Sequence, residues 1–184
     1  MNYWLFGNNP SNRNGWSEEN DITKWIGWKY SLKDFQILID QDKDFEYVLY
    51  NYYVSRNIKN IKTGDVAFFW SFPNFCITTI GVILDLPYKE NGVYWVDLFL
   101  KQLDVHEWIS GVRLKDLDEW KNKKPFTYSK KGNINPQFAN PKKMSIGETS
   151  TIINLLDEEK IEFMFNDELF NILKNVYEND FLDN

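Results

Sequence analysis

Two apolar runs that lie close together in the sequence constrain the fold more than any other feature. Residues 66–72 read VAFFWSF and residues 76–86 read CITTIGVILDL, with Pro73 and Asn74 between them. β-Branched and aromatic residues dominate both runs, and a Pro-Asn pair is typical of a tight turn. We therefore expect two neighbouring antiparallel strands, joined as a β-hairpin, near the middle of the chain.

The remaining pattern adds strands and helices around this hairpin. Further strands are predicted at 3–6, 45–54 and 93–100. Helices are predicted at 17–26, 113–121, in the segment that follows Lys143, with Thr149 or Ser150 near its cap, and in the tail at 161–182. A meander of four or five strands with helices inserted among them favours a small curved or closed sheet over a doubly wound one. The predicted class is therefore α+β, a small curved β-barrel flanked by helices.

The length of 184 residues suits one domain. The charge is unevenly distributed: residues 157–184 hold nine acidic side chains against two lysines, whereas residues 121–143 hold seven lysines and no acidic side chain. We therefore expect a domain over 1–156, followed at 157–184 by an acidic helical extension or a linker to a following domain. The lysine-rich stretch is interpreted either as a phosphate-binding segment or as a solvated loop.

Few groups of the kind that catalysis needs are present. His106 is the only histidine and has no second histidine for a metal, and no phosphate loop or nucleophile motif occurs. An acid and base pair of His106 with Asp97 or Glu107 is the best enzymatic alternative. We expect no catalytic residue, no metal and no cofactor. Cys76 is the only cysteine, so an internal disulfide is excluded.

The sequence also bears on location. It begins MNYWLF, without a basic segment and apolar stretch of the signal-peptide kind, and no run approaches about eighteen apolar residues. We expect a cytoplasmic protein without a membrane partner.

The aromatic share of 17% is high and suits either a bulky core or a surface on which bases stack.

Three motifs point to a family. They are YWLFGNNP at 3–10, NIKTGDVAFFWSF at 60–72 and ITTIGVILD at 77–85. In order and spacing they resemble EVE domains of the PUA-like superfamily, which are related to YTH domains. The segment YYVSRNIKNIKTGDVAFFWSF is most similar to the N-terminal DNA-binding domain of McrB-type restriction proteins. In that frame Trp70 matches the family directly, whereas Tyr52 stands where the family has a tryptophan.

The resemblance implies a domain that reads modified bases in DNA. A methylated base would be flipped out of the stack into an aromatic pocket, and the domain would serve as the specificity part of a modification-dependent restriction system. A motor ATPase or GTPase domain and a nuclease would then act elsewhere in the larger system. The pocket residues expected from the motifs and their chemistry are Asn8, Asn9, Tyr52, Tyr53, Trp70 and Ser71. The phosphate-binding residues expected are Arg56, Lys59, Lys130 and Lys131.

Physical chemistry makes such a pocket reasonable. An asparagine amide offers a donor and an acceptor to a base edge, and an aromatic ring replaces stacking worth about 1–3 kcal/mol per base. Tyr52 and Tyr53 point to opposite faces of an extended strand, so at most one of them lines the pocket. Asn8 and Asn9 are also compatible with an ordinary Asn-Pro turn, and Trp70 with core packing.

Three other functions stay open at this point. The first is a reader of modified RNA of the YTH or PUA type, because the sequence has no feature that recognises a 2′-hydroxyl. The second is a protein-interaction module that docks a partner through its acidic tail. The third is an enzyme that relies on His106.

Overall fold

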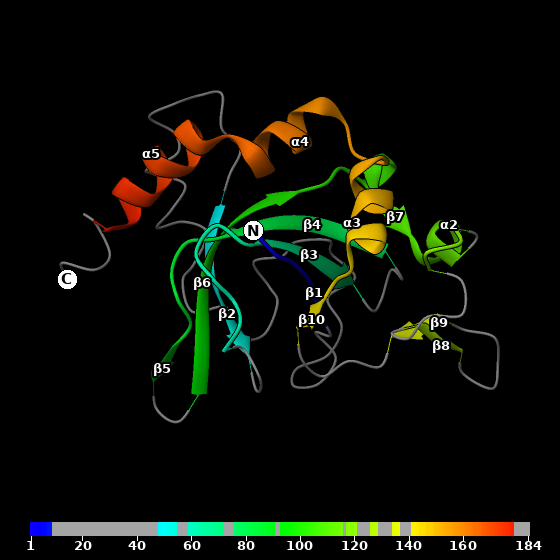
Figure 1. The fold of residues 1–184 in the computed structure, drawn as a ribbon, viewed down its shortest axis with the longest axis horizontal. Coiled ribbons are helices and arrows are strands. Elements are labelled where there is room, and N and C mark those ends of the chain that lie inside the picture. Colours follow the sequence, from blue (N-terminus) through cyan, green and yellow to red (C-terminus); the bar gives the residue numbers. More distant parts are fainter. Residues whose placement is uncertain are drawn as a thin grey trace.

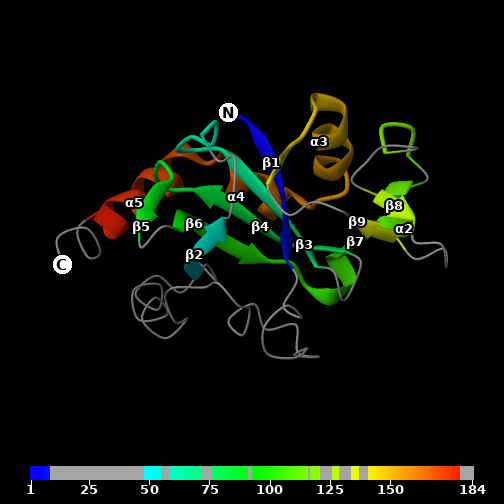
Figure 2. The same ribbon diagram turned by 90° about the horizontal axis from the view of Figure 1, so that it is seen from below.

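The structure, a computed structural model, describes residues 1–8, 48–54, 59–71, 76–90, 93–115, 117–120, 126–128, 134–136 and 141–178. These residues form a mixed α+β fold in which a sheet curls into a half-barrel and helices cover one of its faces (Figures 1 and 2). The helix expected at 17–26 and the turn at Pro73 and Asn74 lie outside the described residues.

The main sheet contains eight strands. Its principal path has the order β10 (Lys142–Lys143), β1 (Tyr3–Asn8), β3 (Val66–Ser71), β4 (Cys76–Ile83), β6 (Val93–Gln102) and β2 (Val48–Val54). Two short strands join it from the side: β5 (Tyr88–Glu90) pairs with β6, and β7 (Ile109–Ser110) pairs with β4. A separate small sheet pairs β8 (Phe126–Tyr128) with β9 (Ile134–Pro136).

The strand pairing confirms the central prediction and corrects another. β3 and β4 are antiparallel, as the two apolar runs indicate. The expectation of a meander is wrong, because β1 pairs in parallel with β3 and β2 lies at the far edge beyond β6. The residue pattern of one strand does not show which other strand it pairs with. The order of the strands in the sheet could therefore not be predicted from the sequence.

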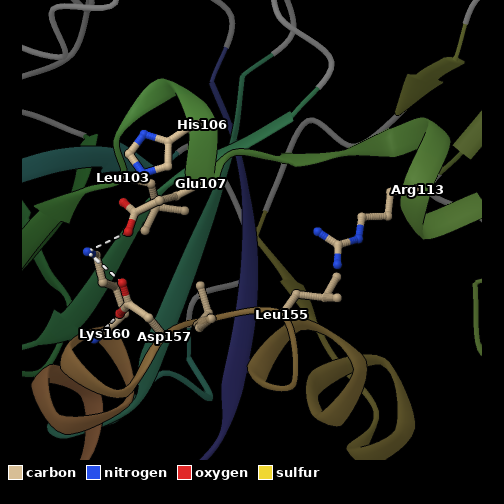
Figure 3. Close-up of a pocket in the computed structure, with 8 residues that line it drawn as sticks. Leu103, His106, Glu107, Arg113, Leu155, Asp157 and Lys160 are labelled. Atoms are coloured by element: carbon tan, nitrogen blue, oxygen red, sulfur yellow. Dashed lines mark hydrogen bonds and ion pairs between the residues drawn. The ribbon is translucent and has the colours of Figure 1, made fainter.

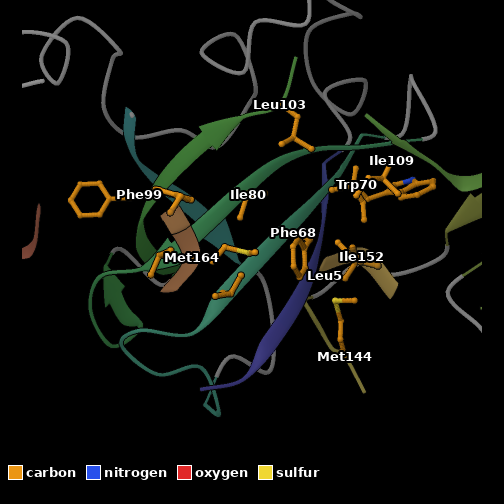
Figure 4. Packing of buried hydrophobic residues seen from close by; sticks show 14 of the residues in the cluster. Leu5, Phe68, Trp70, Ile80, Phe99, Leu103, Ile109, Met144, Ile152 and Met164 are labelled. Atoms are coloured by element: carbon orange, nitrogen blue, oxygen red, sulfur yellow. The ribbon is translucent and has the colours of Figure 1, made fainter. Parts of the chain in front are cut away.

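Both faces of the sheet are buried, which explains the concentration of aromatic residues. Along β3, Phe68 and Trp70 point into one cluster and Phe69 points into the other, and all three are fully buried. The first cluster, here called the helix-side core, lies between the sheet and the helices (Figure 4). The second cluster lies on the opposite face, where the rings of Phe6 and Phe69 stack at 5.1 Å. Burying each such side chain contributes about 1.5–3 kcal/mol.

The KTGD turn fixes how β1 meets β3. The amide of Asp65 donates to the carbonyl of Lys62 over 3.0 Å, and Gly64 has a φ of 79°, the third position of a type II turn. The buried carboxylate of Asp65 then accepts hydrogen bonds from the backbone amides of Asn2 and Lys62 and from Trp4 Nε1. The GD pair therefore ties the start of the chain to the central hairpin.

The α-helices of the described residues come after β7 in the sequence, and three of them come after the last strand, β10. They are α2 (Gly111–Lys115), α3 (Ile146–Ile153), α4 (Glu158–Phe165) and α5 (Asp167–Tyr177), and a 3-10 turn, η3 (Val105–Glu107), precedes them. The cap predicted for α3 at Thr149 or Ser150 is wrong. Ser145 is the N-cap, since its side chain accepts from the Glu148 amide while the Glu148 carboxylate accepts from the Ser145 amide.

The described part of the acidic segment, residues 157–178, contributes to the same core as the sheet. Phe163 and Met164 on α4 and Leu169 on α5 are buried in the helix-side core, so these helices pack on the sheet as Figure 1 shows. Within the described part of the chain, no helix has the length and apolar character required to cross a membrane.

Candidate functional site

A pocket of about 310 Å³ lies where η3, α2 and the start of α4 meet (Figure 3). Its volume is at the lower end of the range of about 300–1,000 Å³ that small-molecule sites occupy. The lining combines three leucines with two carboxylates, two cations and a histidine: Leu103, Leu155, Leu156, Glu107, Asp157, Arg113, Lys160 and His106. The pocket thus offers both apolar walls and polar edges.

Local sequence chemistry positions the α4 side of the pocket. α3 ends at Ile153, and Leu155 and Leu156 lie in the connection that leads to α4. Asp157 is the N-cap of α4, because its side chain accepts from the amide of Lys160 over 3.0 Å. The cap thereby holds Asp157 and Lys160 together at the pocket wall.

An ion-pair cluster joins α4 to η3. Lys160 Nζ contacts Glu107 at 2.7 Å, Asp157 at 3.1 Å and Glu159 at 3.4 Å, and its side chain is only 8% exposed. Burial alone would lower the pKa of Lys160, but the hydrogen bonds and charges of Glu107 and Asp157 raise this pKa above its ordinary value. Lys160 is therefore a cation at neutral pH, and its ammonium lies between the carboxylates of Glu107 and Asp157.

A second lysine strengthens the cluster from the sheet. Lys101 on β6 is buried and forms an ion pair with Glu159. The hydrogen bond from Lys101 lowers the pKa of Glu159, which burial raises to a smaller extent. The pocket wall at α4 is consequently anchored to both η3 and β6.

The opposite side of the pocket carries a cation that is available to a ligand. Arg113 on α2 and His106 on η3 are exposed, and in Figure 3 the guanidinium of Arg113 extends toward Leu155. Among the described residues neither side chain has a hydrogen-bond or ion-pair partner. A guanidinium presents a planar fork of donors that suits phosphate or carboxylate oxygens.

A metal-ligand set is also brought together beside the pocket. Ligand atoms of Asp104, His106 and Glu107 lie within 4.8 Å of one another. However, one carboxylate oxygen of Glu107 accepts from Lys160 and the other accepts from the Asp104 amide over 2.8 Å. Because an ammonium already neutralises Glu107, this cluster is a poor cation site.

Trp70 does not occupy the place that a base pocket requires. Its side chain is 0% exposed and belongs to the helix-side core, as Figure 4 shows. A ring with no exposed surface cannot stack on a base in this conformation, so the burial of Trp70 favours core packing, the alternative that the sequence left open. The reason is that helices cover the face of β3 on which Trp70 lies.

The other predicted residues are brought together only in part. Asn8 on β1 lies directly beside Ser71 on β3 in the parallel register, at the same end of the sheet. Tyr52 and Tyr53 lie on β2, which β4 and β6 separate from β3, and they are paired with Val96 and Trp95. The structure describes the backbone but not the side chains of these four residues.

Of the predicted phosphate-binding residues, Lys59 is exposed in the turn before β3. Asn9, Arg56, Lys130 and Lys131 lie outside the described residues.

Sequence reasoning missed most of the observed pocket. It considered Glu107 and His106 only as an enzymatic pair, and it assigned no role to Arg113, Asp157 or Lys160. One signal was present, since Asp157 three residues before Lys160 is the spacing of a capped helix start with an internal ion pair. The approach of η3 to α4 across 53 residues had no local signal.

Comparisons with known proteins do not assign the chain to a family. No protein-family model matches it, and no curated protein resembles it in sequence.

Proposed function

We propose that this chain is a nucleic-acid-binding domain that holds one unstacked nucleotide of DNA in the pocket between η3, α2 and α4. The observation that carries the proposal is the lining of that pocket, in which leucine walls meet an exposed arginine and a cluster of carboxylates. A nucleotide has matching parts: an apolar base face, an anionic phosphate and a hydrogen-bonding base edge.

The apolar part of the match is the base itself. An extruded base has lost its stacking partners and gains from apolar surfaces that replace them. Leu155 and Leu156 are half-buried at the pocket and Leu103 is buried, while the imidazole of His106 is the one aromatic ring among the lining residues. The leucines therefore offer a flat base ring an apolar contact within a lining that is otherwise polar.

The anionic part of the match is the phosphate. Arg113 has no partner within the described chain and stands on the exposed side of the pocket, so it is the residue we assign to the backbone phosphate. The carboxylates of Glu107 and Asp157 lie on the other side, where a phosphate would be repelled. The nucleotide would therefore enter with its base toward α4 and its phosphate toward α2.

The wider role follows from the sequence resemblance. The curled sheet with flanking helices is compatible with a small PUA-like barrel of the EVE kind. On that basis we propose that the domain reads a modified base for a McrB-type restriction system and catalyses no reaction itself. The motor and nuclease activities would belong to other domains or partners.

Binding of labelled DNA measured by fluorescence anisotropy tests the proposal. We expect tighter binding to a duplex with a mispaired or methylated base than to the fully paired unmodified duplex, because a mispaired base costs less to extrude and a methyl group adds apolar area. Arg113→Ala should weaken binding about tenfold, as expected for the loss of a charge-assisted phosphate contact.

The control is Lys143→Ala, which removes the same charge from an exposed position on β10. Equal effects of the two substitutions would show that only net charge matters and would refute the pocket as the binding site. The same oligonucleotides made as RNA decide between this proposal and the alternative of an RNA reader, for which RNA would bind more tightly than DNA.

A further inference from the structure

Among the described side chains of the pocket wall formed by α4, carboxylates offer hydrogen-bond acceptors, and the donors of Lys160 are already engaged. A lysine ammonium has three N–H donors. Lys160 has three carboxylate partners, Glu107, Asp157 and Glu159, so each of its donors is engaged. A carbonyl group that approached these side chains would meet carboxylate oxygens without a hydrogen to bind.

Asp157 is the carboxylate best placed to accept a further bond. Its side chain is 49% exposed, compared with 17% for Glu107. Its Oδ1 accepts from the Lys160 amide and its Oδ2 accepts from Lys160 Nζ. Because each carboxylate oxygen has about two acceptor sites, Asp157 retains acceptor capacity that faces the pocket.

We infer that the pocket selects bases that carry an exocyclic amino group, and that Asp157 is the residue that recognises this group. The inference rests on the proposed function, since it concerns the base held in the same pocket. The amino group of cytosine or adenine donates to a carboxylate, whereas uracil and hypoxanthine carry a carbonyl oxygen at the equivalent position. A single methyl group on the amine leaves one N–H, so an N-methylated base is still accepted.

The ionisation state of Asp157 supports this direction of selection. Burial raises its pKa, but the hydrogen bonds from the amide and the ammonium of Lys160 lower it below its ordinary value. Asp157 is therefore an acceptor only, at neutral and at mildly acidic pH.

The test compares bases that differ in one group. Labelled duplexes carry a single mispaired cytosine or uracil, and a second pair carries adenine or hypoxanthine. We expect the amino-bearing base of each pair to bind about tenfold more tightly. Asp157→Asn should reduce that preference to less than about twofold, because an amide donates as well as accepts.

Asp157→Asn should change base selection without disturbing α4, and a matched control is available. Asparagine is as good an N-cap as aspartate, so α4 should keep its start. Asp167→Asn removes the same charge from an exposed position on α5 and should leave the preference unchanged. Circular dichroism and the unfolding midpoint of both variants check that the fold is retained.

The outcomes separate the two proposals. If cytosine and uracil bind equally well and binding still depends on Arg113, the selection by amino group is wrong and the pocket remains the binding site. If Asp157→Asn keeps the full preference, Asp157 is not the selecting residue. If no duplex binds in an Arg113-dependent manner, the proposed function itself is refuted.

Discussion

Lys160 on α4 donates a hydrogen bond of 2.7 Å to Glu107 on η3, and this contact joins the two walls of the pocket. Around it the carboxylate of Asp157 and the pair of Lys101 with Glu159 complete a cluster of five charged side chains. Because the cluster is largely covered on the side of the two lysines, it is sensitive to the removal of any one member.

Lys160→Met should lower the free energy of unfolding by about 2 kcal/mol, since it leaves Glu107 and Asp157 without their cation. Urea denaturation measures the change. Lys174→Met is the matched control, because Lys174 pairs with Glu178 near the surface and should contribute less than about 1 kcal/mol. Equal losses in the two variants would contradict a special role of the cluster.

Trp70→Ala should unfold or strongly destabilise the domain, with a loss of about 3–5 kcal/mol, because it empties a fully buried site in the helix-side core. Thermal denaturation followed by circular dichroism checks this. A stable Trp70→Ala variant with selective loss of DNA binding would instead restore Trp70 as part of a base pocket.

Asp65→Ala should cost at least about 3 kcal/mol, since the backbone amides of Asn2 and Lys62 and the indole of Trp4 would lose their acceptor. Chemical denaturation provides the measurement. Asp85→Ala serves as the control, because within the described part of the chain the Asp85 side chain accepts from the neighbouring, exposed Leu86 amide alone. A loss below about 1 kcal/mol for Asp65→Ala would show that the turn does not depend on these bonds.

Acid should destabilise the fold through Glu148. Burial raises the pKa of Glu148, but its bonds from Lys142 and Ser145 lower this pKa overall. A folded-state pKa below the unfolded value stabilises the fold above the unfolded pKa, and this stabilisation is lost as the pH falls through the folded pKa. The unfolding free energy should therefore decrease below about pH 4.5, and Glu148→Gln should make that decrease less steep. An unchanged slope in Glu148→Gln would assign the acid sensitivity to other groups.

The salt dependence of DNA binding should be shallow. The chain has a net charge of -6, and Arg113 is the cation in the pocket that lacks a partner among the described residues. Each neutralised phosphate adds about -0.9 to the slope of log K against log salt, so Arg113→Ala should make the slope less negative by about one. Titrations at several salt concentrations measure both slopes. A steep slope that Arg113→Ala leaves unchanged would place the phosphate contacts elsewhere.

Local patterns in the sequence predict several elements of this fold. The apolar runs of β3 and β4 and the strands β1, β2 and β6 follow from residue types and turns, and α3, α4 and α5 follow from helical spacing. The partner of each strand does not follow, because the parallel pairing of β1 with β3 depends on the long-range bonds of Asp65.

The site was harder to predict for the same reason. Trp70 suits a pocket in the sequence because its exposure depends on helices that lie beyond residue 110, and the sequence gives no sign of where these helices pack. The pocket residues are ordinary charged side chains, and only the contact between Glu107 and Lys160 makes them a group. Long-range contacts of this kind have no local signature.

Photo-crosslinking tests the central claim most directly. A duplex carries 5-iodocytosine at a mispaired position, and the crosslinked peptides are identified by mass spectrometry after irradiation. We predict crosslinks within residues 103–113 or 155–160, the two segments that contain the lining residues of the pocket, and their loss on competition with the unlabelled mispaired duplex. Crosslinks confined to β2 and the end of β1, around Tyr52, Tyr53 and Asn8, would contradict the claim and return the base site to the edge of the sheet.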